Sequence, residues 1–413
     1  MLYTTGVLLY NFVDISTDIQ SIIVVLINNN KILMKHYLLL AGFLALNFSV
    51  FAQTEVSEIE STLLNYIKGT SYNRSKLIEK AFHTNANLYL EKNNKTLWTV
   101  PAKEYASWYK NKKEGEFTGR VGNILSIDNF EGIATAKAEI IIPENGLRYI
   151  DLFLLKKIEN EWKIISKTAS NEESNQKGDK ILFIVSNVSF HGESDIPTGN
   201  SFSEIVNAYD TFKKAGFTVD FVSPKGGSIP LAYINTSDSL QKKLLYNKDF
   251  MYALKNTKKP KEIIANNYKA VHYIGGGSAM YDVPKNKEIQ KISMTIFEEY
   301  SGVISSVCHG TAGIVNLKTK DGKYLVQGKT ISGYPEAYEK EDAAYFKQFP
   351  FLIQKTIEER GGTFKYSPRN SVHVEAHGNV ITGQNYLSSK DVALKIIENI
   401  NGRKKQFVLD KQN

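Results

Sequence analysis

Helical spacing followed by strand patterns characterises the first half of the chain. Apolar residues recur every three or four positions between Glu55 and about Ser75, which predicts an amphipathic helix. Shorter helices are predicted around residues 77–82 and 103–109. Alternating or β-rich runs predict strands at residues 87–91, 96–100, 121–127, 133–142, 148–157 and 161–166. Helices followed by a meander of long strands predict an α+β cone, in which a curved sheet wraps around its helices.

Short, wholly apolar runs between amphipathic helices begin at Ile181. Strands are predicted at residues 181–186, 218–223, 270–274 and 303–307, and helices at residues 202–215 and 285–300. Continuous apolar strands are typical of sheets covered on both faces, so this half predicts a doubly wound parallel α/β fold. Ligands bind such sheets at the carboxyl ends of the strands. Cys308, the glycines Gly275–Gly277 and the loop after Ser186 all fall at that edge.

The two patterns divide the 413 residues into two domains. We expect the cone at residues 55–168 and the α/β domain at residues 181–402. Residues 169–180 are expected to form a linker, because the stretch "NEESNQKGDK" is polar and has no apolar anchor. Residues 403–413 are expected to be a polar tail.

The N-terminal residues have the layout of a targeting segment. Residues 34–52 contain a basic start, an apolar run and small residues at the end, which predicts a signal peptide cleaved before Gln53. We interpret residues 1–33 as a gene-model extension, and the alternative is a membrane-anchored form that uses Ile22–Ile27. The apolar run is too short to span a bilayer comfortably. We therefore expect a secreted or periplasmic protein.

Composition narrows the classes of function. Apolar residues make up 42% of the chain and charged residues 23%, as in ordinary globular proteins. The net charge of +8 is spread along the sequence, and its densest cluster, Lys255–Lys261, has no aromatic residue among its cations. That pattern is typical of a solvated loop, so we expect no nucleic-acid partner. A single cysteine, Cys308, excludes an intramolecular disulfide.

Cys308 lies in the stretch "GVISSVCHGTAG", which predicts a strand, a sharp turn and a helix. Ser306 and Gly310 are small, as a strained turn on either side of a nucleophile requires. Such a turn would expose the sulfur at a helix N-terminus, where backbone N–H groups and the helix dipole stabilise a thiolate. The alternative is a buried structural cysteine. Because His309 and two glycines crowd the turn, we favour a nucleophile.

A cysteine nucleophile needs a base, and the base needs a group that orients it. His309 is adjacent to Cys308 and would reach the sulfur by turning its ring back. Glu339 is the candidate that orients His309, and Glu336 is its competitor. For both glutamates a place on the surface is the plain alternative.

Two further groups complete the predicted site. Glu204 begins the first helix of the α/β domain and could take or share the thiol proton, although the helix dipole alone would also favour it there. Backbone N–H groups of Gly276, Gly277 and His309 are candidates for an oxyanion hole, with a plain tight turn as the alternative. His373-Val374-Glu375 has the spacing of a glutaminase His-x-Glu pair, but it precedes the last strand, so we interpret it as surface.

Residues from about 180 to 400 resemble the ThiJ/PfpI superfamily, which has the flavodoxin-like, class I glutamine amidotransferase-like fold, and within it the chaperone and glyoxalase III branch. The matching pieces, in the family's order, are "PTGNSFSEIVNAYDTFKKAGFTVDFVSPKGG", "YIGGGSAMYDVP", "ISSVCHGTAGIVNL", "GKTISGYPEAYE", "PFLIQKTIEERGGTF" and "HGNVITGQN". The resemblance implies Cys308 as nucleophile, His309 as base, Glu339 as third member and Glu204 as the carboxylate that touches the thiol.

The chain departs from this family at two places. Gly276-Gly277-Ser278 stands where many relatives have Gly-His-Gly, so any role of that histidine is absent. Tyr386-Leu387-Ser388-Ser389 replaces an Asn-Pro-Ala-Ser type of segment and alters one wall of the pocket. Both departures bear on the substrate more than on the thiol chemistry.

Residues 55–168 resemble the nuclear transport factor two-like fold, and in particular its lumazine-binding group. The closing strands, "DLFLLKKIENEWKIISK", carry this resemblance. It implies a cone that holds a small-molecule ligand.

Together these features predict an exported cysteine-dependent enzyme that acts on small reactive dicarbonyls. The expected activity is of the glyoxalase III or deglycase type, converting methylglyoxal to lactate without a metal or an organic cofactor. We expect a small aldehyde as substrate and a homodimer as the assembly. The alternatives are a non-catalytic chaperone-like or thiol redox-sensing protein, and a cysteine peptidase or amidase.

Overall fold

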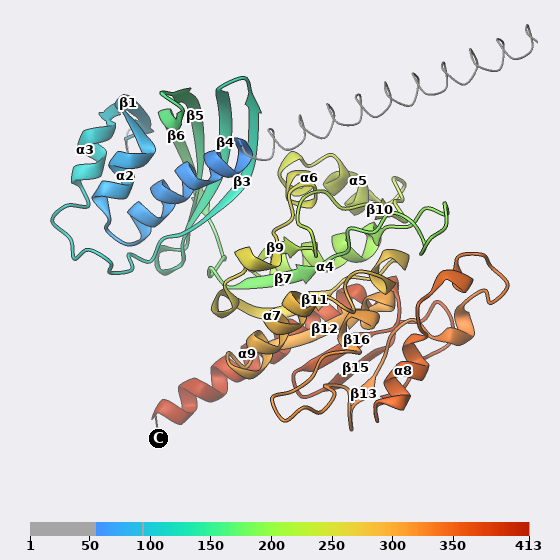
Figure 1. Cartoon of the computed structure of the whole chain (residues 1–413). Helices are drawn as coiled ribbons and strands as arrows, with labels where there is room; N and C mark the ends of the chain where they lie inside the picture. The colour runs from blue at the N-terminus through green and yellow to red at the C-terminus, as the bar shows by residue number, and fades with distance from the viewer. Residues whose placement is uncertain (1–54, 93–94, 413) are drawn as a thin grey trace, which may run out of the picture. The chain divides into compact units, whose positions relative to one another are not determined.

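The computed structural model describes residues 55–92 and 95–412 and contains two six-stranded sheets (Figure 1). The predicted extension, 1–33, and the predicted signal peptide, 34–52, lie outside the described residues, so both stay predictions. Across the described part of the chain, no helix combines the length and the apolar character that crossing a bilayer requires.

The first sheet has the strand order β2-β1-β6-β5-β4-β3, and its neighbours are antiparallel except for β1 and β6. Phe153 and Leu155 of β5 are buried, whereas Leu152 and Leu154 are 47% and 44% exposed, so one face of the sheet is apolar. This arrangement confirms the α+β cone. Its strands are β1 (Phe82–Glu91), β2 (Leu97–Pro101), β3 (Val121–Phe130), β4 (Ile133–Ile142), β5 (Leu147–Ile158) and β6 (Glu161–Glu173), and its helices span residues 55–71, α2 (Ser75–Ala81) and α3 (Ala102–Ser107).

The connection between the sheets is shorter than predicted. Strand β6 still pairs with Leu147 at Glu173, so residues 169–173 belong to the sheet and only residues 174–179 connect it to β7 (Lys180–Ile184). The polar end of β6 gave no apolar signal because its side chains are mostly exposed. The predicted polar tail, 403–413, also differs, because helix α9 (Ser389–Gln412) continues through most of it.

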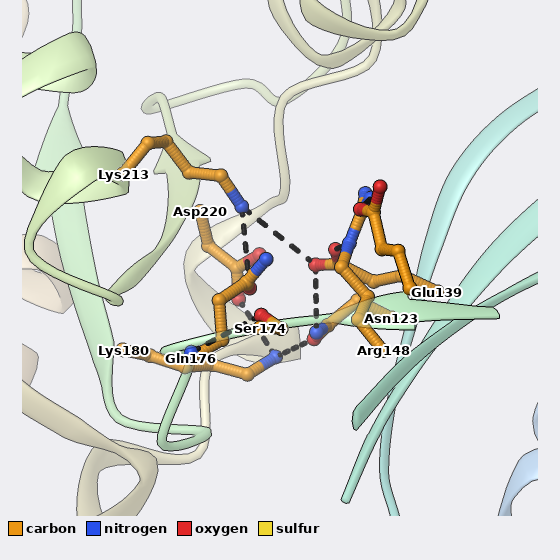
Figure 2. A network of polar contacts seen from close by, with 9 residues as sticks. Asn123, Glu139, Arg148, Ser174, Gln176, Lys180, Lys213 and Asp220 are labelled. Atoms are coloured by element: carbon orange, nitrogen blue, oxygen red, sulfur yellow. Dashed lines mark hydrogen bonds and ion pairs between the residues drawn. The ribbon is translucent and has the colours of Figure 1, made fainter. Parts of the chain in front are cut away.

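Polar contacts surround this connection (Figure 2). Lys180 donates to Asn123 and lies 3.4 Å from Asp220 Oδ2. Glu139, which is 1% exposed, accepts from Arg148 Nε at 2.8 Å. These contacts satisfy charged groups that burial would otherwise penalise.

The second sheet has the order β9-β7-β11-β12-β16-β15. All neighbours are parallel except β15 and β16, which are antiparallel. The order matches a flavodoxin-like doubly wound sheet with one added edge strand and confirms the predicted class. The remaining strands of this sheet are β9 (Thr218–Val222), β11 (Tyr268–Tyr273), β12 (Val303–Val307), β15 (Val374–His377) and β16 (Val380–Gly383).

Helices cover both faces of this sheet. Ile181 and Phe183 of β7 join a core with residues of α4, α6 and α9, whereas Leu182 and Ile184 join a second core with residues of α7 and α8. Residues 181–184 are therefore apolar on both faces of the sheet, as the sequence predicted. The helices are α4 (Phe202–Lys214), α5 (Ser239–Leu245), α6 (Lys248–Lys255), α7 (Lys287–Glu298) and α8 (Ile353–Glu359).

Short elements complete the fold and supply loops at the sheet edge. Two small parallel pairs join β8 (Asn200–Ser201) to β10 (Leu231–Ala232), and β13 (Thr330–Ile331) to β14 (Thr363–Phe364). The 3₁₀ turns are η1 (Pro143–Asn145), η2 (Pro260–Glu262), η3 (Ala265–Asn267), η4 (Gly277–Met280), η5 (Cys308–Ile314), η6 (Glu336–Tyr338), η7 (Phe346–Gln348) and η8 (Tyr386–Ser388).

Substitution of Gly310 tests how tightly η5 packs on β11. A Cβ atom at Gly310 would lie 2.4 Å from the carbonyl oxygen of Tyr273, which is backbone and cannot move aside cheaply. Gly310→Ala should therefore lower the free energy of unfolding by about 1–3 kcal/mol in urea denaturation. Gly402→Ala is the control, because that position in α9 is open, and it should be neutral or stabilise by up to about 1 kcal/mol. Equal stability of the two variants would contradict the tight packing.

Candidate active site

Cys308 lies at the turn between β12 and η5, with a backbone φ of +57°. This left-handed conformation is uncommon for a residue with a side chain and marks a strained position. Gly275 allows the turn to close, because a Cβ there would lie 2.9 Å from Cys308 Cβ. The predicted sharp turn is present, but a 3₁₀ turn follows it in place of an α-helix. The side chain is also buried, at 8% exposure, so the prediction of an exposed sulfur was wrong.

His309 lies between the thiol and a carboxylate and contacts both. Its Nδ1 lies 3.5 Å from Cys308 Sγ, and its Nε2 lies 2.7 Å from Glu339 Oε1. Because an ionised carboxylate only accepts, the proton of a neutral His309 lies on Nε2, and Nδ1 presents a lone pair to the thiol. The structure thus brings together Cys308, His309 and Glu339.

Glu336, the competitor of Glu339, faces a different partner. Its Oε1 accepts from the backbone N–H of Lys355 at 3.0 Å. Glu339 has a second contact instead, because Tyr345 Oη donates to its Oε2 at 3.1 Å. Both oxygens of Glu339 are therefore held, which fixes the orientation of the carboxylate toward His309.

Glu204, in the first turn of α4, contacts the thiol from another direction. It is 1% exposed, accepts from Gly275 N–H at 2.8 Å and forms a hydrogen bond with Cys308. Burial raises the pKa of Glu204 to about 7, although these hydrogen bonds oppose the rise. A carboxyl group with this pKa gives up and takes back a proton near neutral pH.

The thiol itself is protonated at rest. Burial raises the pKa of Cys308 well above its ordinary value, and the negative charge of Glu204 raises it further. A backbone hydrogen bond from His309 opposes this rise. The sequence prediction of a thiolate stabilised at a helix N-terminus was wrong in direction, because desolvation outweighs the local N–H contact. The thiolate must therefore form by proton transfer to a neighbouring group.

Of the three glycines after β11, Gly275 packs against Cys308. A Cβ at Gly276, where φ is +97°, would meet Gly199 and Ser201, and a Cβ at Gly277 would lie 2.5 Å from the ring of His191. These approaches explain why glycine occupies the positions. The assignment of Gly276, Gly277 and His309 to an oxyanion hole stays a prediction.

Aromatic residues that the sequence analysis did not single out line the site. The ring of Tyr334 stacks on His309 with centroids 4.7 Å apart, and Phe349 lies 5.5 Å from His309. Tyr334 follows Gly333 directly and precedes Glu339 in the stretch that matched the family, so this motif could have identified it. A small pocket beside His309 and Glu339 is lined by Met280, Tyr334, Glu336, Phe346, Phe349, Phe351, Leu352 and Ile353.

His191, in the loop after β7, is a second histidine near the site. Its Nδ1 lies 2.9 Å from Tyr281 Oη, and its ring lies 5.5 Å from Tyr345 and 5.9 Å from Phe349. Burial lowers the pKa of His191, so the ring is neutral at pH 7. No sequence motif identified this residue; its place at a strand's carboxyl end was the only signal.

Other candidate groups have different partners. His373 Nε2 lies 3.0 Å from Glu375 Oε1, and its Nδ1 lies 2.7 Å from Ser367 Oγ, so this pair interacts within its own loop and strand. Among residues 55–92 and 95–412, no group of three or more His, Cys, Asp or Glu side chains is arranged to hold a metal ion.

Comparisons with known proteins agree with this two-part description. The profile of the DJ-1/PfpI family matches residues 197–399, and that of a family described as "Putative lumazine-binding" matches residues 54–170. In Schizosaccharomyces pombe, glutathione-independent glyoxalase hsp3102 is 32% identical over 213 residues, which is 48% of this chain and 86% of that protein. In Candida albicans, Glyoxalase 3 is 29% identical over 213 residues, covering 48% of this chain and 89% of that protein.

A solved structure has the same fold as the α/β domain. Rapid Encystment Protein 24 kDa of Francisella tularensis superposes with a TM-score of 0.51 at 25% identity, over 54% of this chain and 99% of that one. The S. pombe relative is 32% identical and 86% of its length is covered, so the likeness extends to the sequence as well as the fold. The chain belongs to the DJ-1/PfpI family, and its α/β domain is an enzyme of that family's type.

Proposed function

We propose that the α/β domain converts small reactive dicarbonyls, such as methylglyoxal, into hydroxyacids by glyoxalase III or deglycase chemistry. The observation that carries the proposal is the continuous contact from Glu204 through Cys308 and His309 to Glu339. The glyoxalase names of the S. pombe and C. albicans relatives support the class of substrate. Both carbons of a dicarbonyl react, so the site must provide one nucleophile and groups that move protons.

The first step forms the nucleophile. His309 Nδ1 takes the proton of Cys308, and the thiolate adds to the aldehyde carbon of methylglyoxal to give a hemithioacetal. Glu339 stabilises the His309 imidazolium that results, because its carboxylate accepts a hydrogen bond from Nε2–H at 2.7 Å. The imidazolium then returns its proton to the new alkoxide.

The next steps exchange oxidation levels between two carbons of the substrate. Glu204 takes the hydrogen of the former aldehyde carbon as a proton, and a proton returns to the former ketone carbon through an enediol. The first carbon is thereby oxidised to a thioester with Cys308, and the second is reduced to an alcohol. Water hydrolyses the thioester, which releases lactate and regenerates the thiol. The balance is methylglyoxal plus water to lactate, with no external electron carrier.

Burial of the thiol favours this enzyme over a redox sensor. Cysteines that sense oxidants are accessible and have a low pKa, whereas Cys308 is 8% exposed and its pKa is raised. Export through a cleaved signal peptide and assembly into homodimers stay predictions.

Turnover of methylglyoxal without glutathione tests the proposal. The wild-type protein should form lactate, and Cys308→Ala should form none, because the nucleophile is lost. Glu339→Gln should lower kcat by about 10²-fold, since the amide no longer fixes the proton on His309 Nε2. Glu341→Gln, at an exposed glutamate two residues further along the chain, should leave kcat within about twofold. Lactate formation by Cys308→Ala, or equal rates for the two glutamate variants, would refute the proposed roles.

The pH dependence of turnover tests Glu204. Because its pKa is about 7, the carboxylate that accepts a proton exists mainly above pH 7, so kcat should rise with pH through about 7. Glu204→Gln should lower kcat by about 10²–10⁴-fold and remove this rise. Glu288→Gln, in the exposed first turn of α7, is the control and should keep the wild-type profile. Retention of the rise in Glu204→Gln would assign it to another group.

Stability has the opposite dependence on Glu204. A pKa raised from 4.5 to about 7 means that folding favours the protonated carboxyl, so this stabilisation is full below about pH 4.5 and is lost as the pH rises through 7. The melting temperature of Glu204→Gln should therefore fall less than that of the wild type between about pH 5 and pH 8. An equal fall in both proteins would show that Glu204 is not the buried titrating group.

A further inference from the structure

The interior of the cone contains a buried charged group that the glyoxalase chemistry does not use. Asp151 of β5 is 1% exposed, lies 2.8 Å from Lys167 Nζ of β6 and accepts from Tyr66 Oη at 2.6 Å. Lys167 is 4% exposed. The carboxylate and the ammonium neutralise each other, so this pair needs no further counter-charge.

Tyrosine hydroxyl groups extend from Asp151 in a chain. Tyr66 Oη lies 3.5 Å from Tyr105 Oη, which lies 3.3 Å from Tyr109 Oη. All three side chains are buried. Because Tyr66 gives its proton to Asp151, its oxygen can only accept from Tyr105, and Tyr105 in turn accepts from Tyr109. The hydroxyl group of Tyr109 ends the chain and can redirect its proton to an added acceptor.

Arg120, just before β3, is a second cation beside this chain. Its Nε–H is buried and has no hydrogen-bond partner among the described residues. The charge of Arg120 acts on the hydroxyl groups of Tyr66 and Tyr105, where it opposes the rise of the pKa that burial causes. The guanidinium is thus near these hydroxyl groups without bonding to them. A buried donor left unpaired costs free energy and calls for an explanation.

We propose that the cone binds a small aromatic carboxylate, whose oxygens accept hydrogen bonds from Arg120 and from the end of the tyrosine chain. A carboxylate matches the fork of donors on a guanidinium, and it would balance the second cation, because Asp151 acts on both Lys167 and Arg120. Two aromatic rings lie beside these groups: the Tyr149 ring centroid is 6.0 Å from the guanidinium carbon, and the Trp108 and Tyr105 ring centroids are 5.1 Å apart. These rings favour a planar apolar body on the ligand.

Calorimetric titration of the full chain with benzoate and benzamide tests the proposal. The two probes have nearly the same shape, but only benzoate carries a charge. Benzoate should bind at millimolar or lower concentration, and benzamide should bind at least about 10-fold more weakly, as expected when a charged hydrogen bond is lost. The titration measures binding without turnover, so its result is independent of the proposed glyoxalase activity.

Variants locate the site. Arg120→Gln should weaken benzoate binding at least about 10-fold and abolish the preference over benzamide, whereas Arg120→Lys should keep part of it. Arg74→Gln, at an exposed arginine of the same domain, should bind as the wild type does. If Arg120→Gln does not fold, the preference of the wild-type protein and the result for Arg120→Lys decide the question. Absence of benzoate binding, equal binding of both probes, or unchanged binding in Arg120→Gln would each overturn the proposal.

Discussion

Burial of the Cys308 thiol beside the Glu204 carboxyl is the constraint on which the rest of the site depends. Two acids that share a site of low dielectric cannot both ionise easily, and burial raises the pKa of each. The resting site therefore holds its protons, and nucleophilicity has to be generated locally. This requirement gives His309 its purpose: with the Nε2 proton held by Glu339, Nδ1 presents its lone pair to the thiol. The hydrogen bond from Tyr345 Oη to Glu339 holds that carboxylate in place.

The doubly wound sheet delivers these groups from separate segments to one edge. Cys308 follows β12, Gly275 follows β11, and Glu204 begins the helix after β8. Parallel strands end at the same edge, so residues far apart in sequence meet there without a long excursion of the chain. The cost is a strained backbone at Cys308, with φ at +57°, which neighbouring glycines make room for.

Local patterns predicted the central strands of this sheet well, because β7, β11 and β12 are mostly buried and rich in apolar residues. Strand β12 was predicted at its observed limits, and β7 and β11 within two residues. The end of β6 was missed because its polar residues are held by backbone pairing with β5. Such pairing does not require an apolar pattern when the side chains are exposed. Likewise, spacing could not separate Glu339 from Glu336, since the choice depends on how η6 turns.

The electrostatics of the site was less accessible from sequence. The turn at Cys308 predicted a stabilised thiolate, yet the pKa depends on how completely distant segments cover the sulfur. Tyr345 and His191 escaped notice for the same reason. His191 is fixed by Tyr281, 90 positions away, and no short motif records such a contact.

The contact between His191 and Gly277 limits which side chains position 277 can carry. A Cβ at position 277 would lie 2.5 Å from the His191 ring, so a side chain at 277 would overlap with that ring. Gly277 stands where many members of the ThiJ/PfpI superfamily have a histidine in this turn. In this chain the ring of His191, from the loop after β7, occupies the neighbouring space. A side chain at position 277 and the His191 ring in its present place therefore exclude each other.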